Sequence, residues 1–193
     1  MDAVNHSRYD IGGGFTRFFA LFGLQRSFVV DEHRLNSLRE KLLSETHPDR
    51  FVSSTESQKK VALKYTKIIN LGFSVLVDPV KRGVHLCYLS GIDLDLDNFR
   101  FTDQIFLEKQ LEIREEIEEV KEKNIEGRGV LISSIEKNLA STFEGFISSL
   151  CENFQIFLDG NVDVVNDLKN SLAIISFMQK VFVEIDGLKR SLN

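Results

Sequence analysis

His47-Pro48-Asp49-Arg50 is the stretch that decides the fold of this 193-residue chain. Proline has a fixed φ and no backbone donor, and it pushes the residue before it out of the α region. A helix that enters this tetrad must therefore end at about Thr46. The sequence predicts an exposed turn here, with an imidazole and a carboxylate on either side of a rigid ring. On its own, a turn of this kind is a common way out of a helix and assigns no function.

Two amphipathic stretches flank the tetrad. Residues 32–46 carry leucines at helical spacing, and Asp31 before them is suited to cap a helix. Residues 55–77 carry a second, longer apolar stripe that ends before Asp78-Pro79. The two apolar faces can cover each other only if the chain folds back as a helical hairpin, which places the tetrad at its tip. A short aromatic helix over residues 15–22 would fill the groove between them.

The order of short helix, helix, His-Pro-Asp turn and helix resembles the J domain of DnaJ-type co-chaperones. Residues 19–24 are similar to the opening of that domain, and residues 69–70 and 76–79 are similar to its third helix. Residues 88–93 and 106–117 closely resemble HscB, the J-type co-chaperone of iron-sulfur cluster assembly. The Gly/Phe-rich linker and cysteine-rich repeats of general DnaJ proteins are not found. The resemblance therefore implies an all-α, HscB-type co-chaperone.

The resemblance also implies how the tetrad acts. It would engage the nucleotide-binding domain of a heat-shock chaperone of the HscA/DnaK type and stimulate ATP hydrolysis there. Asp49 would pair with a chaperone arginine, while His47 and Pro48 hold the loop against the contact. Acidic residues interrupt the basic face of the preceding helix, so electrostatic steering is expected to be weak, as suits a dedicated partner. The basic residues expected to help docking are Arg39, Lys41 and Arg50.

Three long amphipathic patterns follow the hairpin region. The first ends near Gly127-Arg128-Gly129, the second stops at Gly160-Asn161, and the third begins near Asp163. Helices joined by such short turns are expected to form an antiparallel bundle. The predicted organisation is a disordered extension (1–14), a J domain (15–91), a linker (92–102) and a C-terminal three-helix bundle (103–193).

The first bundle helix carries two apolar stripes. One, formed by Phe106, Ile113, Ile117 and Val120, is assigned to the bundle core. The other is the pair Leu107 and Leu111, in a segment (108–126) with eight acidic and four basic residues, a local charge of −4. Spacing alone leaves open whether this second face is buried, simply solvated or a binding surface.

The HscB resemblance favours the binding surface. It implies that this helix, with one residue of the last helix, holds the iron-sulfur scaffold protein IscU. Glu108 stands where the family pattern has an apolar residue, which predicts a smaller apolar area. Burying each leucine contributes roughly 1.5 to 3 kcal/mol, so its loss is measurable. The positions that match the scaffold-binding surface are Leu107, Glu108, Leu111, Glu112, Glu115, Glu119 and Phe177.

Composition excludes several other classes of protein. A net charge of −5 argues against nucleic acid as the partner, because phosphate contacts need a basic face. Cys87 and Cys151 are isolated and expected to pack in helices, so no disulfide, metal site or cofactor is predicted. No apolar run is long enough to span a bilayer, and no secretory signal is recognisable. We expect a monomer in the bacterial cytoplasm, in preference to the mitochondrial matrix.

Two alternatives differ from the scaffold-specific co-chaperone. An enzyme would use His47 as a general base oriented by Asp49, but two side chains on either side of a proline are unlikely to meet in that geometry. No nucleophile motif or phosphate-binding glycine loop accompanies them. A general J-domain co-chaperone would deliver unfolded clients to DnaK. An acidic bundle without a broad exposed apolar groove argues against this second alternative, and the sequence predicts such a bundle.

Overall fold

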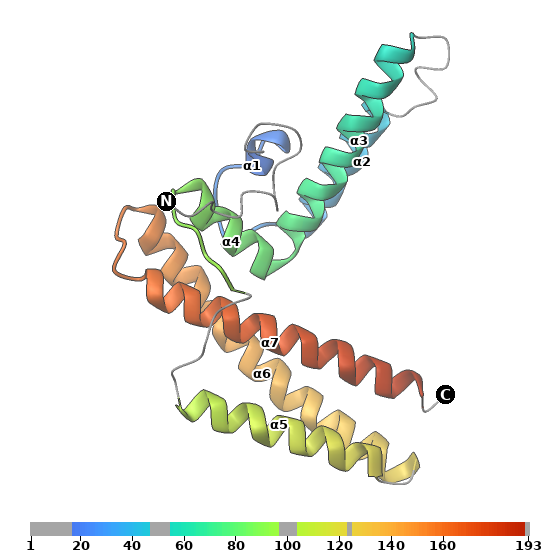
Figure 1. Cartoon of the computed structure of the whole chain (residues 1–193), viewed down its shortest axis with the longest axis vertical. Coiled ribbons are helices and arrows are strands. Elements are labelled where there is room, and N and C mark those ends of the chain that lie inside the picture. Colours follow the sequence, from blue (N-terminus) through green and yellow to red (C-terminus); the bar gives the residue numbers. More distant parts are fainter. Residues whose placement is uncertain (1–16, 47–54, 97–103, 123–124, 192–193) are drawn as a thin grey trace. The chain divides into compact units, whose positions relative to one another are not determined.

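The computed structural model describes residues 17–46, 55–96, 104–122 and 125–191. Within these ranges every regular element is an α-helix, as predicted (Figure 1). The chain divides into two compact units, Met1–Leu94 and Asp95–Asn193. The tetrad, the expected disordered extension and residues 97–102 of the expected linker lie outside the described residues. No helix among the described residues is long and apolar enough to cross a membrane.

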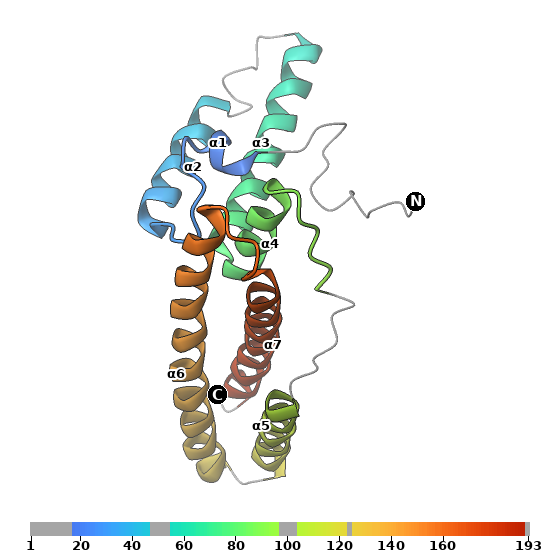
Figure 2. The same ribbon diagram turned by 90° about the vertical axis from the view of Figure 1, so that its left-hand side faces the viewer.

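The first unit contains four helices. α2 and α3 lie side by side as the predicted hairpin, and α1 and α4 pack against α3 (Figures 1 and 2). The start of α3 is fixed by a reciprocal cap: the Gln58 amide donates to Thr55 Oγ1 at 3.4 Å, and the Thr55 amide donates to Gln58 Oε1 at 3.0 Å. The hairpin is therefore defined on both sides of the tetrad. The helices are α1 (Phe18–Leu21), α2 (Glu32–Thr46), α3 (Glu56–Val77) and α4 (Pro79–Leu89).

The core of the first unit is aromatic and lies where α1 meets α3. Phe18, Phe19 and Phe22 are all buried, and Phe18 and Phe22 pack close to the α3 backbone because residue 72 is glycine. A Cβ at Gly72 would come within 2.8 Å of Phe18 Cδ1 and 3.1 Å of Phe22 Cε2. Gly72 therefore allows the aromatic helix to lie closer to α3 than any other residue would.

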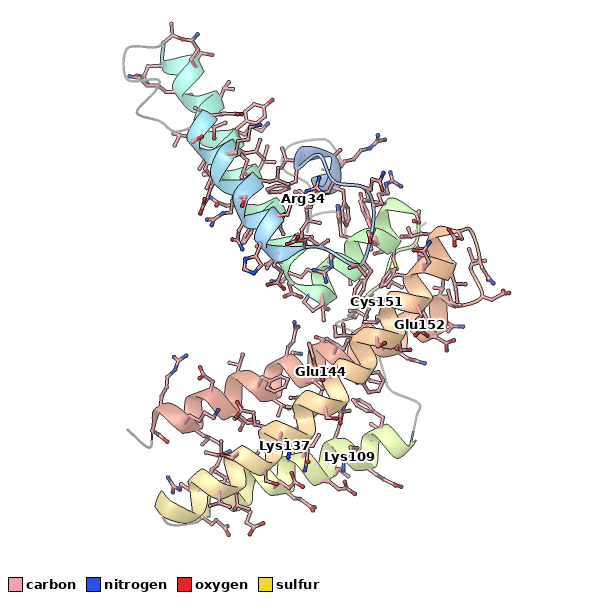
Figure 3. The ribbon with its side chains drawn as sticks, turned by 180° about the vertical axis from the view of Figure 1, so that it is seen from behind. Arg34, Lys109, Lys137, Glu144, Cys151 and Glu152 are labelled. Atoms are coloured by element: carbon pink, nitrogen blue, oxygen red, sulfur yellow. The ribbon has the colours of Figure 1, made fainter. Side chains whose placement is uncertain are left out.

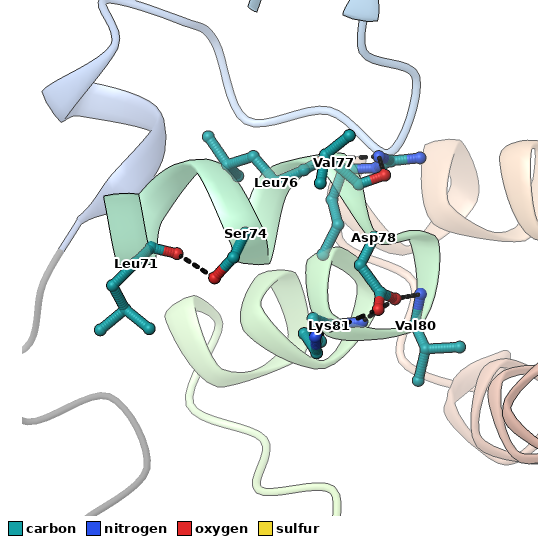
Figure 4. Close-up of polar contacts among 8 residues, drawn as sticks. Leu71, Ser74, Leu76, Val77, Asp78, Val80 and Lys81 are labelled. Carbon is teal, nitrogen blue, oxygen red and sulfur yellow. Dashed lines mark hydrogen bonds and ion pairs between the residues drawn. The ribbon is translucent and has the colours of Figure 1, made fainter. Parts of the chain in front are cut away.

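The junction between α3 and α4 is held by side chains that bond to the backbone (Figure 4). The Asp78 carboxylate accepts hydrogen bonds from the amides of Val80 at 2.9 Å and Lys81 at 3.1 Å, which caps α4. The Arg82 side chain is buried and donates from Nη1 to the carbonyl of Leu76 at 2.6 Å. Its guanidinium also lies 5.0 Å from the centre of the Phe28 ring. A carbonyl group at the end of α3 thereby receives its hydrogen bond from a buried cation.

The second unit is a three-helix bundle in which each helix runs antiparallel to the next (Figure 2). Its core contains the predicted stripe of α5, since Phe106, Ile113, Ile117 and Val120 are 8%, 9%, 2% and 0% exposed. Exposed ion pairs join the helices at one end: Lys121 to Glu184 at 3.3 Å and Lys189 to Glu136 at 2.6 Å. The helices are α5 (Gln104–Glu122), α6 (Ile125–Leu158) and α7 (Val165–Arg190).

The expected turn at Gly127-Arg128-Gly129 is wrong. α6 begins at Ile125 and passes through both glycines. Glycine in a helix costs only about 1 kcal/mol relative to alanine, which tertiary contacts can offset. One such contact is the hydrogen bond from Arg128 Nη2 to the Lys121 carbonyl at 2.7 Å, which joins the first turn of α6 to the end of α5. The turn between α6 and α7 does follow the glycine signal, because Gly160 has a φ of 103°.

Candidate functional site

Helices α2 and α3 of the hairpin position the predicted docking residues that precede the tetrad. Arg39 on α2 is half-buried and donates from Nε and Nη2 to the Asn70 side-chain oxygen on α3, at 3.2 and 2.9 Å. Its guanidinium also lies 4.7 Å from the centre of the Phe73 ring. Arg39 therefore joins α2 to α3. A docking partner that bound its guanidinium would compete with these contacts. Lys41, the other predicted docking residue in the described part of α2, is exposed.

The net positive charge of the two hairpin helices lies on α3, whereas the charges of α2 cancel. α2 carries three acidic side chains against three Lys and Arg, whereas α3 carries one glutamate against four lysines. Lys59 is paired with Glu56 at 3.1 Å, and the exposed lysines Lys60, Lys64 and Lys67 extend along the same helix. A partner with an acidic surface would therefore be attracted to α3 as well as to the tetrad.

The second predicted surface lies on α5. Leu107 and Leu111 are 41% and 62% exposed, so the bundle does not use them as core residues. Successive residues of a helix are about 100° apart, which puts this pair on a different side of α5 from Ile113 and Ile117. The predicted scaffold-binding acids, all of them exposed, are Glu108, Glu112, Glu115 and Glu119.

A local ion pair modifies the charge of this α5 surface. Lys109 Nζ donates a hydrogen bond to Glu112 Oε2 at 2.7 Å, and this bond raises the pKa of Lys109 above its usual value. The pair compensates one of the acids and leaves the surface negative. An apolar pair beside carboxylates suits a partner with an apolar spot bordered by Lys or Arg.

Phe177 is the predicted contribution of the last helix to this surface. Its ring is half-buried and packs edge-on against Phe106, with 5.9 Å between the ring centres. Phe177 therefore belongs largely to the bundle core, and only part of its ring remains for a partner. The contact between Phe106 and Phe177 joins the start of α5 to α7.

The bundle was predicted to lack a broad exposed apolar groove, and the structure has a groove whose apolar floor is largely buried. A cavity of about 560 Å³ lies among α5, α6 and α7, open to solvent along one side. α6 has 34 residues and α5 has only 19, so the helices cannot cover one another along their whole length. The floor is apolar and consists of core side chains, while the rim is polar. Periodicity could not reveal this groove, because the same residues read as ordinary core positions in the sequence.

Two buried groups of the first unit have strongly shifted pKa values. Burial, together with a smaller effect of the positive charge of Arg26, lowers the pKa of His85 to about 4. Burial also raises the pKa of the Cys87 thiol to about 12. His85 lies among Phe18, Phe19 and Tyr88, with ring centres 4.9 to 6.4 Å away. At neutral pH both groups are uncharged core residues, and the packing prediction for Cys87 is confirmed.

The described residues contain no cluster of three or more His, Cys, Asp or Glu side chains suited to a metal ion. Cys151, the other cysteine, is half-buried in α6, and neither cysteine forms a disulfide.

Comparison of the sequence with known proteins identifies the family of this chain. No family model matches the sequence. A protein of Pseudoalteromonas atlantica described as a co-chaperone protein HscB homolog is 30% identical to this chain over 170 residues, which cover 88% of the chain and 94% of the relative. The chain belongs to the HscB family of co-chaperones. A Shewanella woodyi HscB homolog is 29% identical over 180 residues, 91% of this chain and 98% of that protein.

Solved HscB structures share the fold. Chaperone HscB from Vibrio cholerae superposes with a TM-score of 0.79 at 23% identity, over 92% of this chain and 100% of that one. Human co-chaperone protein HscB gives a TM-score of 0.79 at 22% identity, over 92% and 84% of the two chains. The predicted HscB-type helical fold and co-chaperone family are therefore confirmed.

Proposed function

We propose that this protein is a co-chaperone of iron-sulfur cluster assembly that brings an IscU-type scaffold to a heat-shock chaperone of the HscA/DnaK type and stimulates its ATPase. Membership of the HscB family carries this proposal. Both the hairpin on either side of the tetrad and the exposed leucine pair on α5 support it. ATP hydrolysis takes place on the chaperone, and this chain supplies binding surfaces.

The chaperone-binding half is centred on His47, Pro48 and Asp49. α2 ends at Thr46 and α3 begins after the Thr55 cap, so two fixed helix ends lead into the tetrad. Asp49 offers a carboxylate to a chaperone arginine, and a charge-assisted pair of this kind is about twice as strong as a neutral hydrogen bond. Arg50 within the tetrad and Lys41 on α2 add positive charge. The exposed lysines of α3 extend that charge, while Arg39 chiefly keeps α2 and α3 together.

The scaffold-binding half is the outer face of α5. Leu107 and Leu111 supply apolar area that is exposed in this chain, and the four glutamates beside them attract a basic rim. Burying two leucines contributes enough to dominate a small interface. Phe177 completes the surface through the part of its ring that Phe106 leaves uncovered.

The protein is proposed to act as a monomer in the bacterial cytoplasm. The absence of a disulfide at Cys87 and Cys151 agrees with a reducing compartment, and the relatives from Shewanella woodyi and Pseudoalteromonas atlantica, which cover most of this chain, are bacterial proteins.

Steady-state ATPase assays with the HscA- or DnaK-type chaperone of the same genome test this function. We expect the protein to stimulate hydrolysis and the variants His47→Gln and Asp49→Asn to lose that stimulation, because each removes a group that contacts the chaperone. Glu45→Gln is the matched control, since it changes the same charge on an exposed part of α2 without touching the tetrad. Unchanged stimulation by both tetrad variants would reject the co-chaperone mechanism.

A further inference from the structure

The groove among α5, α6 and α7 is separate from the leucine pair of the proposed scaffold contact, although Phe106 of the groove packs against Phe177. Lys109 and Glu116 contribute to its α5 side, and Lys109 is labelled in Figure 3 on α5 next to α6. Leu107 and Lys109 are two residues apart and therefore point about 160° away from each other around α5. The groove and the leucine pair thus lie on opposite flanks of the same helix. A ligand in the groove would leave the leucines accessible.

The size and floor of the groove suit an apolar ligand. A volume of about 560 Å³ lies within the range of pockets that bury a small ligand or a few side chains. The side chains of the floor are less than 10% exposed, and an apolar occupant would cover the apolar surface that they still present to the groove. The floor residues are Phe106, Ile113, Ile135, Leu139, Ile174 and Met178.

The rim favours a peptide over other apolar ligands. Three carboxamides, Asn138, Asn153 and Asn170, stand around the groove together with the hydroxyls of Thr142 and Ser149. A carboxamide offers both a donor and an acceptor, which is the combination that each residue of a peptide backbone needs. An extended chain could therefore place apolar side chains on the floor while its backbone bonds to the rim.

The charge of the rim indicates what flanks the apolar residues. The rim carries the carboxylates Glu116 and Asp167 against the single cation Lys109, whose charge is already compensated by Glu112 at 2.7 Å. A ligand with a carboxylate head, such as a fatty acid, would be repelled by this rim. A peptide with a Lys or Arg beside its apolar residues would be attracted.

We propose that this groove binds extended peptide segments in which apolar residues are flanked by a basic residue. The protein would then carry a second kind of cargo besides the scaffold, namely unfolded or flexible polypeptide. This inference goes beyond the proposed function, since the groove lies off the scaffold-binding face and needs no cluster-assembly partner.

Fluorescence anisotropy of labelled nonapeptides tests the proposal on the full chain. The probes have a leucine- and valine-rich centre with lysine at both ends, the same centre with glutamate at both ends, and a serine-rich centre with lysine at both ends. We expect the first probe to bind at least about tenfold more tightly than either of the others. Equal binding of the glutamate-ended probe, tighter binding of dodecanoate than of the first probe, or no binding at all would overturn the proposal.

A variant that fills the groove provides the matched comparison. Thr142→Trp places a large ring at the rim and should weaken the first probe by about tenfold or more. Ser148→Trp, on an exposed position about 120° around the same helix, should not change its affinity. Titration of Thr142→Trp with the scaffold should give the wild-type affinity. Loss of peptide binding in the groove can therefore be told apart from loss of the proposed scaffold binding.

Methyl NMR of the unmodified chain keeps the test independent of variants. Adding the lysine-ended peptide should shift the signals of Ile113, Ile135 and Met178 and leave those of Leu107 and Leu111 in place. Shifts confined to Leu107 and Leu111 would show that peptides use the leucine face, and they would overturn the proposal. Peptide-dependent self-association seen by light scattering would do so as well, because it would make a second copy of the chain the occupant.

Discussion

The two units bury different kinds of side chain. The first unit concentrates aromatic rings, a cationic side chain and a neutral imidazole around Gly72 and the start of α4, while α2 has only Leu35 fully buried. The second unit distributes mainly aliphatic core residues, with Phe106, Phe154 and Phe157 among them, along three helices, and the ion pairs that join these helices in the described part of the chain lie at the surface. We therefore expect substitutions around Gly72 and α4 to destabilise the first unit strongly, and substitutions along α2 to have small effects. The second tolerates change on its outer faces, where cargo would bind.

Removing the buried cation of the first unit should have the largest effect. Arg82→Met leaves the Leu76 carbonyl without its charged donor and should lower the unfolding free energy of the first unit by about 2 to 4 kcal/mol. The matched change in the second unit, Lys189→Met, breaks an exposed pair with Glu136 and should cost less than about 1 kcal/mol. Hydrogen exchange of each unit measures both. Similar losses would remove the distinction between the units.

His85 should make the stability of the first unit depend on pH. Its pKa is about 4 in the folded chain because of burial, and returns toward 6.5 on unfolding. The unfolded state therefore binds the proton first as the pH falls. The contribution of His85 to the unfolding free energy is therefore fully present above about pH 6.5. It decreases as the pH falls toward 4, by up to about 3 kcal/mol.

The measurement compares the wild type with His85→Phe between pH 7 and pH 4.5. The difference in unfolding free energy between them should change with pH in the first unit and stay constant in the second. A difference independent of pH would show that His85 is accessible to protons in the folded chain.

Two glycines sharpen the comparison of packing. Gly72→Ala puts a Cβ against Phe18 and Phe22 and should destabilise the first unit by about 1 to 2 kcal/mol, because overpacking exceeds the gain in helix propensity. Gly145→Ala on α6 meets no atom within 4 Å and should stabilise the second unit by about 0.5 to 1 kcal/mol. Thermal unfolding of both variants gives the two signs. The same sign for both would contradict the close approach of α1 to α3.

The lysines of α3 should have the smallest effect. Lys60→Ala with Lys64→Ala should weaken chaperone binding several-fold at low salt, by no more than about 1 kcal/mol, and the difference should vanish at high salt. The control is Lys137→Ala with Lys180→Ala, which removes two exposed lysines from the second unit. Equal weakening by both pairs would indicate net charge rather than a surface on α3.

The sequence predicted most helices because their signals are local. Thr46 ends α2 before a proline, Thr55 and Gln58 form a cap, and the core stripe of α5 follows helical spacing. Other features depend on distances between helices. Gly127 and Gly129 resemble a turn but lie in α6, because contacts with α5 compensate for two glycines. The buried Arg82 could not be foreseen, since the carbonyl it satisfies becomes available only when α4 folds against α3.

The candidate surfaces divide in the same way. A helical wheel separated Leu107 and Leu111 from the core stripe of α5 but left their exposure open, and the groove beside α6 required the lengths and packing of three helices. The partial burial of Phe177 against Phe106 likewise depends on where α5 begins relative to α7.

The central claim is that separate surfaces serve the chaperone and the scaffold. Calorimetric titration of the scaffold into Leu107→Ser with Leu111→Ser tests it most directly, together with stimulation of the chaperone ATPase by the same variant in the absence of scaffold. We predict that scaffold affinity falls by about 30-fold or more, since two exposed leucines lose their burial, while ATPase stimulation stays at the wild-type level. Unchanged scaffold affinity, or equal loss of both activities in a variant that remains folded, would contradict the account.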